Sequence, residues 1–560
     1  MAENARIARK DDAIMNATPS RVLCAFVITT AFASGGLALS RQTVVDVDGK
    51  VDSVFAKWTS TTPGCAVGVA TDGRPVLARG YGMADLEHDV RVTPDTIFEA
   101  GSVSKQFTAA AVLLLAREKK LSLDDPVRRH IPELPDYGSP LSIRHMLNHT
   151  SGLRDWGSVA GIAGWPRTTR VHTHAHVLEI VSGQHALNFT PGTRWSYSNT
   201  GFNLAAMIVQ RVSGTPFPEF TRTRLFQPLG MTHTSWRDDY TRIVKGRAMA
   251  YADRNGEFRT DMPFENVYGN GGLLTTVGDL LKWNENFTSP VVGDASLVTE
   301  QQRVGTFNDG RPHGYGLGLF VGTHKGLREV YHSGSTAGYS AFLTRFPDER
   351  VSVAVLCNAT SGQATQYAHT VADIFLADRL KPSDPVASYT LTDADVDRIA
   401  GLYRSDDTGL PATIAREKDG SLRADRVPLL PQSALRFLTA GRQVWEVDAH
   451  GMRRTDEFGT VEEFARVRAA SPTVQDLETY AGTYASDEAE TVLTALVEHG
   501  KLVLKRRPDT TIGLTPIYAD AFGAGGPGTV IFRRDASGRV TALSVKQDRV
   551  WDLKFNREAR

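Results

Sequence analysis

A serine and a lysine lie three residues apart at the start of a long apolar segment, FEAGSVSKQFTAAAVLLLA. Ser102-Val-Ser-Lys105 is the only Ser-x-x-Lys in the chain. Residues at this spacing share one face of a helix, so the hydroxyl and the amine are predicted to be neighbours. A helix that begins at Ser102 would also direct backbone amides and the positive end of the helix dipole at its oxygen.

The chemistry that this pair could perform is acyl transfer. A serine hydroxyl becomes an effective nucleophile when a base accepts its proton, and burial favours the neutral, basic form of a lysine amine. The apolar residues that follow Lys105 would supply such burial. An isolated Ser-x-x-Lys is more often an N-capping serine and a lysine that reaches solvent, so Ser102 and Lys105 need partners elsewhere in the chain.

Two segments offer a tyrosine and an asparagine as partners. Tyr197-Ser-Asn199 follows a Pro-Gly turn and precedes an apolar helix, and Tyr268-Gly-Asn270 precedes a different one. A tyrosine hydroxyl near an ammonium can act as a base, and an asparagine amide can orient a lysine and a substrate carbonyl. Spacing alone does not choose between the two segments.

Histidines provide the remaining candidates. His332-Ser-Gly334-Ser335 ends a predicted strand, where a sheet edge can present a side chain and a backbone amide to a ligand. A second His-x-Gly, at His324, falls in a predicted turn. The alternating histidines of VHTHAHVLEI would share one face of a strand, but no acidic fourth ligand is placed beside them, so we predict no metal there.

Strands are predicted at both ends of the first 380 residues, with helices between them. Two strands joined at Asp72-Gly73 precede the helix of Ser102. From Tyr315 onward, the short alternating strands YGLGLFVG, REVYHSG, GYSAFLTRF and RVSVAVLC precede a helix near 364–380. This order predicts an α+β domain at 46–380, an antiparallel sheet flanked by helices with an inserted helical region.

The remainder of the chain repeats itself after KPSDP, a predicted linker at 381–385. VDRIAGLYRSD and LETYAGTYASD resemble each other, and each is followed by short strands with Asp-Gly or His-Gly turns. Two small antiparallel β-barrel modules are therefore predicted, at 386–470 and 472–560. GAGGPG at 523–528 does not precede a helix, so we interpret it as a hairpin loop rather than a phosphate-binding loop.

The first 45 residues are predicted to be a leader. Arg21, an apolar stretch and small residues are typical of a signal segment, so we expect export to the periplasm or the exterior, with a cytoplasmic location as the alternative. No segment resembles a membrane-spanning helix. The chain has three cysteines and no Cys-x-x-Cys pair, and Cys65 and Cys357 lie in apolar runs that predict buried free thiols.

Composition sets limits on the partners. The 560 residues are 41% hydrophobic and carry a formal net charge of zero, so neither nucleic acid nor a highly charged partner is indicated. No cofactor is predicted. The sequence does not determine the number of subunits, and a homodimer is compatible with it.

Taken together, Ser102-Val-Ser-Lys105, Tyr197-Ser-Asn199 and His332-Ser-Gly334 resemble the three signatures of serine β-lactamase-like and penicillin-binding hydrolases. IRHMLNHTSGL, GGLLTTVGDLLKW and HSGSTAGYSAFLTRFPDE extend the resemblance over about 51–380 in the same order. The resemblance implies a β-lactamase/transpeptidase-like fold, and it favours Tyr197 over Tyr268 as the base.

The mechanism that the resemblance implies is serine acyl transfer without a metal. Ser102 attacks a carbonyl, Tyr197 takes its proton with Lys105 close by, and water hydrolyses the acyl-enzyme. Backbone N–H groups of Ser102 and Ser335 hold the oxyanion. The predicted substrate-binding or supporting residues are Asn199, His332, Gly334 and Ser335.

One departure from the family pattern limits the range of expected substrates. Members that bind a carboxylate often have Lys-Thr-Gly where this chain has His332-Ser-Gly, and a neutral imidazole attracts a carboxylate less than an ammonium does. His-x-Gly with two β-barrel modules is similar to D-aminopeptidases and to the peptidases that cut linearised microcystin. We predict a peptidase or amidase for small linear peptides, including D- or unusual residues. The alternatives are an esterase or β-lactamase, or a β-lactam-binding sensor without turnover.

Overall fold

The structure is a computed structural model. It describes residues 47–166, 169–381, 389–439, 443–457 and 459–559. The predicted leader, with Cys24, and nearly all of the predicted linker lie outside the described residues. The predicted domain boundaries stay a prediction. Within the described part of the chain, no helix is both long and apolar enough to cross a membrane.

A six-stranded antiparallel sheet brings the two ends of the first region together. Its strand order is β12 (Phe320–His324), β13 (Leu327–Thr336), β14 (Tyr339–Phe346), β15 (Val351–Cys357), β1 (Cys65–Thr71) and β2 (Arg74–Tyr81). The predicted turn joins β1 to β2, with Asp72 and Gly73 both at positive φ (51° and 73°), as the tightest hairpin turns require. The first predicted strand after Tyr315 is shorter than expected, because regular pairing starts at Phe320.

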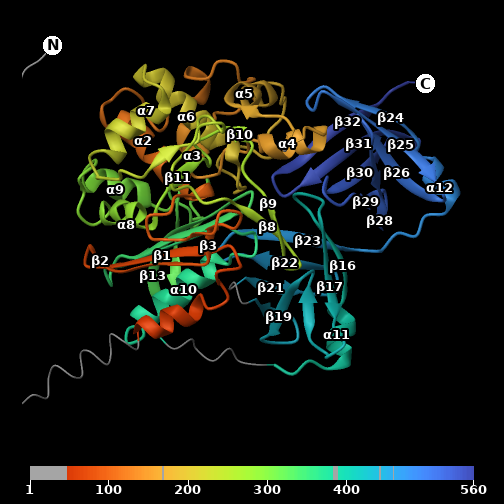
Figure 1. Cartoon of the computed structure of the whole chain (residues 1–560). Coiled ribbons are helices and arrows are strands. Elements are labelled where there is room, and N and C mark those ends of the chain that lie inside the picture. The colour runs from red at the N-terminus through yellow and green to blue at the C-terminus, as the bar shows by residue number, and fades with distance from the viewer. Residues whose placement is uncertain (1–46, 167–168, 382–388, 440–442, 458, 560) are drawn as a thin grey trace, which may run out of the picture. The chain divides into compact units, whose positions relative to one another are not determined.

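Helices cover both faces of this sheet, and the side chains of β1 show how. Ala66 and Ala70 belong to the cluster that includes α8 (Val277–Glu285), whereas Val67 and Val69 pack with α10 (Ala364–Phe375). Alternate residues of a strand point to opposite faces, so both faces of β1 are buried. Figure 1 shows α8 and α10 on opposite sides of the sheet.

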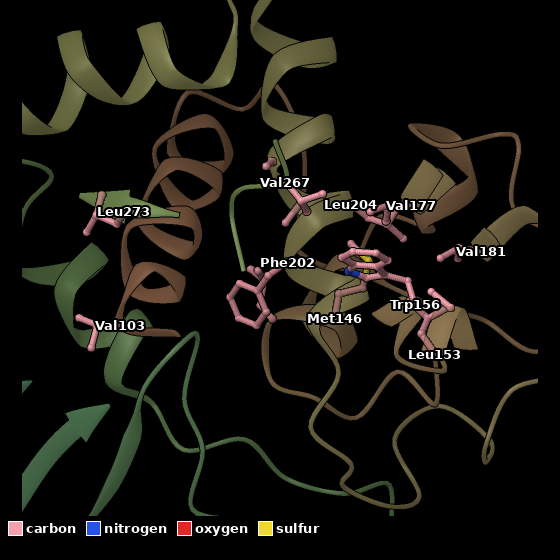
Figure 2. Packing of buried hydrophobic residues seen from close by; sticks show 14 of the residues in the cluster. Val103, Met146, Leu153, Trp156, Val177, Val181, Phe202, Leu204, Val267 and Leu273 are labelled. Atoms are coloured by element: carbon pink, nitrogen blue, oxygen red, sulfur yellow. The ribbon is translucent and has the colours of Figure 1, made fainter. Parts of the chain in front are cut away.

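The inserted region is mainly helical and encloses a large apolar core. Figure 2 shows Trp156, Phe202 and Met146 packed together within that core. The helices are α2 (Lys105–Arg117), α3 (Ile143–Leu147), α4 (Trp156–Ala163), α5 (His174–Ser182), α6 (Asn199–Ser213), α7 (Phe217–Thr221) and α9 (Ala295–Gln302). Single turns lie at η1 (Gly101–Ser104), η2 (Val127–Arg129) and η3 (Arg222–Phe226).

Short strands connect these helices to the main sheet. The order β5 (Phe98–Glu99), β11 (Leu273–Thr275), β7 (Ser235–Trp236) forms a small sheet directly before η1. The other pairs are β3 (Met83–Asp85) with β4 (Val90–Arg91), β6 (His172–Thr173) with β10 (Glu265–Asn266), and β8 (Tyr251–Arg254) with β9 (Glu257–Thr260).

Two antiparallel β-sheets follow. The first is a closed barrel of β16 (Gly401–Ser405), β17 (Pro411–Arg416), β18 (Leu422–Ala424), β19 (Val427–Pro431), β20 (Arg436–Leu438), β21 (Val444–Val447), β22 (Gly451–Thr455) and β23 (Val461–Val467). The second, with nine strands, contains β24 (Gly482–Ser486), β25 (Thr491–Glu498), β26 (Lys501–Arg506), β27 (Thr510–Gly513), β28 (Thr515–Tyr518), β29 (Ala521–Gly523), β30 (Thr529–Arg534), β31 (Val540–Gln547) and β32 (Val550–Arg557). Its edge strands, β27 and β28, are consecutive in the chain.

The sequence repeat corresponds to a repeated structure. In each copy a short helix, α11 (Asp393–Ile399) or α12 (Val474–Glu478), leads into the first strand of a sheet. The tyrosine of that strand then donates a hydrogen bond to a carbonyl four residues earlier: Tyr403 to Ile399, and Tyr484 to Tyr480. The predicted α+β fold followed by two β-barrel-like modules is confirmed. GAGGPG joins β29 to β30 and is a hairpin loop, as predicted.

Two local predictions are wrong. Cys65 and Cys357 are not free thiols but form a disulfide, because β1 pairs with β15 in a register that places them opposite each other. The alternating histidines do not share a strand face. His172 is in β6, while His174 and His176 begin α5, where Thr173 and His176 form a capping box. A two-residue strand is too short for the expected alternation.

Candidate active site

Ser102 lies on the single turn η1, directly before α2. The hydrogen bond from the Ala100 N–H to the Leu273 carbonyl (2.8 Å) joins the start of this turn to β11, and the Ser104 hydroxyl bonds the Gly101 carbonyl. Unlike its neighbours in the turn, Ser102 is only partly buried. The turn therefore presents one side chain, the Ser102 hydroxyl, while the rest is packed in the core.

The turn and strand β13 approach each other so closely that glycine is required on both sides. A Cβ atom on Gly334 would lie 2.0 Å from the Ala100 carbonyl oxygen and 3.0 Å from the Ser102 nitrogen. A Cβ on Gly101 would lie 2.6 Å from the Ser335 nitrogen. The backbones that carry the amides of Ser102 and Ser335 are thus in direct contact.

Lys105 is the first residue of α2 and has no exposed surface. Its Nζ lies 3.0 Å from Oγ of Ser102, 2.9 Å from Oδ1 of Asn199 and 2.8 Å from the carbonyl oxygen of Asn270. Burial is the main cause that holds the pKa of Lys105 well below its usual value, and the positive charge of Arg549 acts in the same direction. The amine beside Ser102 is therefore biased toward its neutral form.

Asn199 is held by a buried carboxylate that the sequence did not reveal. Asp155 caps α4 by accepting from the Ser158 N–H, and its other oxygen accepts from the Asn199 N–H at 2.8 Å. Asp155 is 3% exposed, so this contact joins the starts of α4 and α6 inside the core. The Asn199 amide, the acceptor for Lys105, is positioned as a result.

Tyr268-Gly-Asn270, the alternative to Tyr197-Ser-Asn199 in the sequence, also belongs to the site, but through a backbone carbonyl. Asn270 contributes a carbonyl oxygen to Lys105, while its side chain accepts from Asn203 at 2.7 Å. Tyr268 instead packs against His174, at 4.1 Å between ring centroids. A backbone carbonyl has no residue type, so the sequence could not indicate this contact.

The Tyr197 ring lies beside Lys105, with Nζ 4.7 Å from the ring centroid. Burial raises the pKa of Tyr197 above its usual value, although the hydrogen bond with Ser102 opposes that change. The phenol is therefore favoured over the phenolate in the free protein. His149 supports this segment, because its Nδ1 accepts from the Ser198 N–H at 3.2 Å and its ring packs on Tyr197.

His332 is buried on β13 and is held neutral. Burial is the main cause that lowers its pKa to about 3, and the charge of Lys105 adds to the effect. Nδ1 lies 2.5 Å from the Ser333 carbonyl, which can only accept, so Nδ1 carries the proton. Nε2, 2.9 Å from the Tyr315 hydroxyl, is then the acceptor. His332 therefore has no positive charge to offer a substrate at neutral pH.

The predicted site residues meet at one cavity of about 1240 Å³. Of the seven, only Lys105 lies behind the cavity wall, in contact with Ser102 and Asn199. The other six line it: Ser102, Tyr197, Asn199, His332, Gly334 and Ser335. The structure thus brings all seven together. Trp156 does not line the cavity; it is a core residue whose indole N–H donates to Asn203.

An arginine from the second C-terminal module completes the cavity wall. Arg549 lies between β31 and β32, and its guanidinium carbon is 4.8 Å from the centroid of the Tyr197 ring. The Arg549 carbonyl accepts hydrogen bonds from the Asp155 N–H and the Asn188 side chain. No sequence pattern indicated Arg549, because more than 400 positions separate it from Ser102.

The fold agrees with comparisons to known proteins. The family model described as Beta-lactamase matches residues 51–376. The chain therefore belongs to the beta-lactamase family and is a serine hydrolase of that family.

Relatives extend the likeness beyond the matched region. A D-aminopeptidase of Gluconobacter oxydans (strain 621H) is 29% identical over 520 residues, which cover 88% of this chain and 96% of that protein. Penicillin-binding protein 4* of Bacillus subtilis (strain 168) is 27% identical and covers 66% of this chain and 86% of its own. The octameric penicillin-binding protein homologue from Pyrococcus abyssi has a similar fold, with a TM-score of 0.54 and 24% identity over 75% of this chain and 99% of its own. The predicted homodimer stays a prediction.

Proposed function

We propose that this protein is an aminopeptidase or amidase that releases D-residues from small peptides or amides through an acyl-enzyme on Ser102. The observation that carries the chemistry is the buried Lys105 amine, 3.0 Å from the Ser102 hydroxyl. The relative at 29% identity, a D-aminopeptidase that is covered almost along its whole length, supports the choice of substrate.

The hydrogen-bond partners of Lys105 favour the neutral amine as the proton acceptor. Asn199 Oδ1 and the Asn270 carbonyl can only accept, so they take the two N–H groups of a neutral amine. Its lone pair is then left for the Ser102 hydroxyl. Deprotonation of that hydroxyl by Lys105 forms the nucleophile, which attacks the substrate carbonyl.

Tyr197 is then the group that passes a proton to the leaving amine. The sequence favours Tyr197 as the base, but burial keeps its phenol protonated, whereas burial makes Lys105 basic. We therefore assign the first proton transfer to Lys105 and the protonation of the leaving group to Tyr197, which recovers its proton from Lys105. Water then attacks the acyl-enzyme, and the same proton transfers in the reverse direction restore the Ser102 hydroxyl and release the product acid.

The backbone amides of Ser102 and Ser335 are proposed to hold the oxyanion. The close contact between their segments, which requires Gly101 and Gly334, supports this assignment because it brings the two backbones together. Removal of one donor from such a site typically costs about 2.7–4 kcal/mol of transition-state stabilisation.

The charges around the cavity suit a substrate with a free amine. Neutral His332 replaces the ammonium that other family members use for a carboxylate. Asp261 and Glu265 line the cavity and can accept from a substrate ammonium; the Glu265 carboxylate also lies 3.5 Å from the Arg237 guanidinium. Arg549 narrows the same cavity, which favours small substrates.

A substrate panel tests the proposal. We expect D-amino acid amides and p-nitroanilides to be hydrolysed at least about tenfold faster, in kcat/KM, than their L-enantiomers. N-acetylation of the same substrates should lower kcat/KM, because it removes the ammonium. Preference for L-residues, or for N-acetylated substrates, would contradict the assignment.

The same assay separates the alternatives. An esterase would hydrolyse p-nitrophenyl esters of D- and L-residues equally and leave the amides intact, and a β-lactamase would hydrolyse a chromogenic cephalosporin. The sensor alternative, which the likeness to a penicillin-binding protein keeps open, predicts permanent labelling of Ser102 by a fluorescent penicillin without turnover.

We also infer that the protein is exported. The leader pattern motivates this location, and the buried Cys65–Cys357 disulfide supports it, because disulfides persist in oxidising compartments. Cell fractionation with non-reducing mass analysis should find the oxidised protein in the periplasm or medium. Recovery of reduced protein from the cytoplasm alone would contradict the inference.

A further inference from the structure

Four side chains outside the serine machinery gather between the edge of the main sheet and α10. His324 ends β12, Glu329 lies in β13, and His369 and Asp373 are four residues apart on α10. Residues four apart share a helix face, so both side chains of α10 meet the β12–β13 hairpin. Two imidazoles and two carboxylates from β12, β13 and α10 therefore lie close together.

The potential ligand atoms are close enough to share one ion. The ring nitrogens and carboxylate oxygen of His324, Glu329 and His369 all lie within 4.8 Å of one another. Nε2 of His369 is 2.8 Å from Oε1 of Glu329, and Nε2 of His324 is 2.8 Å from Oδ1 of Asp373. The two imidazoles are stacked, with ring centroids 4.2 Å apart.

A bound ion would shift these ligand atoms. Zinc bonds of about 2.0–2.2 Å in tetrahedral geometry place neighbouring ligand atoms about 3.3 Å apart. The His369–Glu329 pair would therefore open by about half an ångström, and the proton between them would leave. The other ligand atoms of the group, which lie within 4.8 Å of one another, would close toward the same separation.

The surroundings of Glu329 resemble a built site rather than a chance surface pair. Glu329 is only 2% exposed, and the Thr344 hydroxyl donates to its Oε1 at 2.7 Å. Such a contact fixes the orientation of a ligand. Asp373 also binds the Lys325 ammonium at 2.7 Å through its other oxygen, which leaves Oδ1 directed at His324.

We propose that His324, Glu329 and His369 bind one zinc-class divalent ion, with a water as the fourth ligand and the Asp373 carboxylate held beside His324. Two imidazoles with a carboxylate suit zinc. His369 and Asp373 line the same cavity as Ser102, so the ion lies in the cavity wall. It joins α10 to the β12–β13 hairpin and takes no part in the serine chemistry.

Metal titration of the full-length protein tests the site. After treatment with a chelator and its removal, Co²⁺ should bind at one ion per chain and give the visible absorption of a four-coordinate site. Zn²⁺ should displace it and raise the Tm. Absence of a bound ion near stoichiometry, measured by calorimetry and elemental analysis, would overturn the proposal.

Variants locate the bound ion. His369→Ala should lower the affinity for Zn²⁺ by at least about tenfold, and His369→Gln, which keeps a hydrogen-bond donor for Glu329, should do the same while preserving the fold. His88→Ala is the matched control, because His88 belongs to an exposed group with Asp85 and Glu87. Binding that survives both His369 variants, or that is lost in His88→Ala, would overturn the assignment.

Discussion

Lys105 is a lysine without exposed surface and with amide oxygens, not carboxylates, as its hydrogen-bond acceptors. An ammonium in this position loses its hydration and gains no opposite charge in direct contact, so the neutral amine is favoured. This is the physical reason that the site is ready to accept a proton at neutral pH.

The pH dependence of catalysis follows from this environment. The neutral amine is the active form, so kcat/KM should rise with pH through the lowered pKa of Lys105 and be established well below pH 10.5. Lys105→Met should reduce kcat/KM by about 10²–10⁴-fold. Lys105→Arg should not restore it, because a guanidinium stays protonated.

If the acidic limb of the pH profile of kcat/KM is unchanged in Lys105→Met, this assignment of Lys105 is contradicted. Circular dichroism should accompany the measurement, so that a loss of activity is not confused with a loss of folding.

Among the residues of the site, the sequence predicts side chains that carry chemistry and misses those that position them. Ser102, Tyr197 and His332 stand in recognisable motifs. Asp155 is missed because a carboxylate that caps a helix looks like any other N-cap in sequence. Asn270 acts through its carbonyl, and only coordinates can identify that contact.

The hairpin connection between β31 and β32 brings a distant element into the site through Arg549. Its positive charge lowers the pKa of Lys105. In Arg549→Ala the pKa of Lys105 should therefore rise, and the acidic limb of kcat/KM should move upward by about one pH unit. Arg549→Lys keeps the charge and should leave the limb near its original position.

The size of accepted substrates provides a second readout for the same variants. Arg549→Ala widens the cavity, so kcat/KM for a larger substrate should rise relative to that for a D-amino acid amide. If Arg549→Ala behaves like the wild type in both the pH profile and the substrate range, the Arg549 side chain has no role in the site.

Elements with strong local signals are the ones that the sequence predicts well. The β1–β2 hairpin is predicted from Asp72-Gly73, and α6 from the apolar run after Asn199. The Cys65–Cys357 disulfide is missed, because the pairing of β1 with β15 depends on strands 292 residues apart. Long-range register is not encoded in either segment alone.

The catalytic region and the second C-terminal module share one continuous apolar core. Polar contacts reinforce it. Arg154, 4% exposed, binds Glu488 at 2.7 Å, and Arg506 donates to the carbonyls of Gly161 and Ile162 at the end of α4. The module is therefore part of the folded unit rather than an independent appendage.

Removal of this module tests that conclusion. A protein truncated after residue 470 should lose about 5 °C or more in Tm, because apolar surface of the shared core becomes exposed and Arg154 loses its ionic partner Glu488. Any folded truncated protein should accept larger substrates, since Arg549 is absent. Unchanged stability together with an unchanged substrate range would contradict the proposed role of the module.

The repeat was readable from the sequence because both copies keep an Ala-Gly-x-Tyr pattern. Its tyrosine makes the same contact in each copy, Tyr403 to Ile399 and Tyr484 to Tyr480. Its relation to the site was not readable, since nothing in the copies themselves indicates what they pack against. The strand patterns predicted an α+β domain, and the resemblance of three motifs to a known family predicted which fold of that class it is.

The Ser102 hydroxyl is the proposed nucleophile, and its removal is the decisive test. Hydrolysis of a D-amino acid p-nitroanilide should be measured for the wild type and for Ser102→Ala, with folding checked by circular dichroism. We expect kcat to fall by at least about 10³-fold in the variant. A folded Ser102→Ala protein that keeps more than about a tenth of wild-type turnover would contradict it.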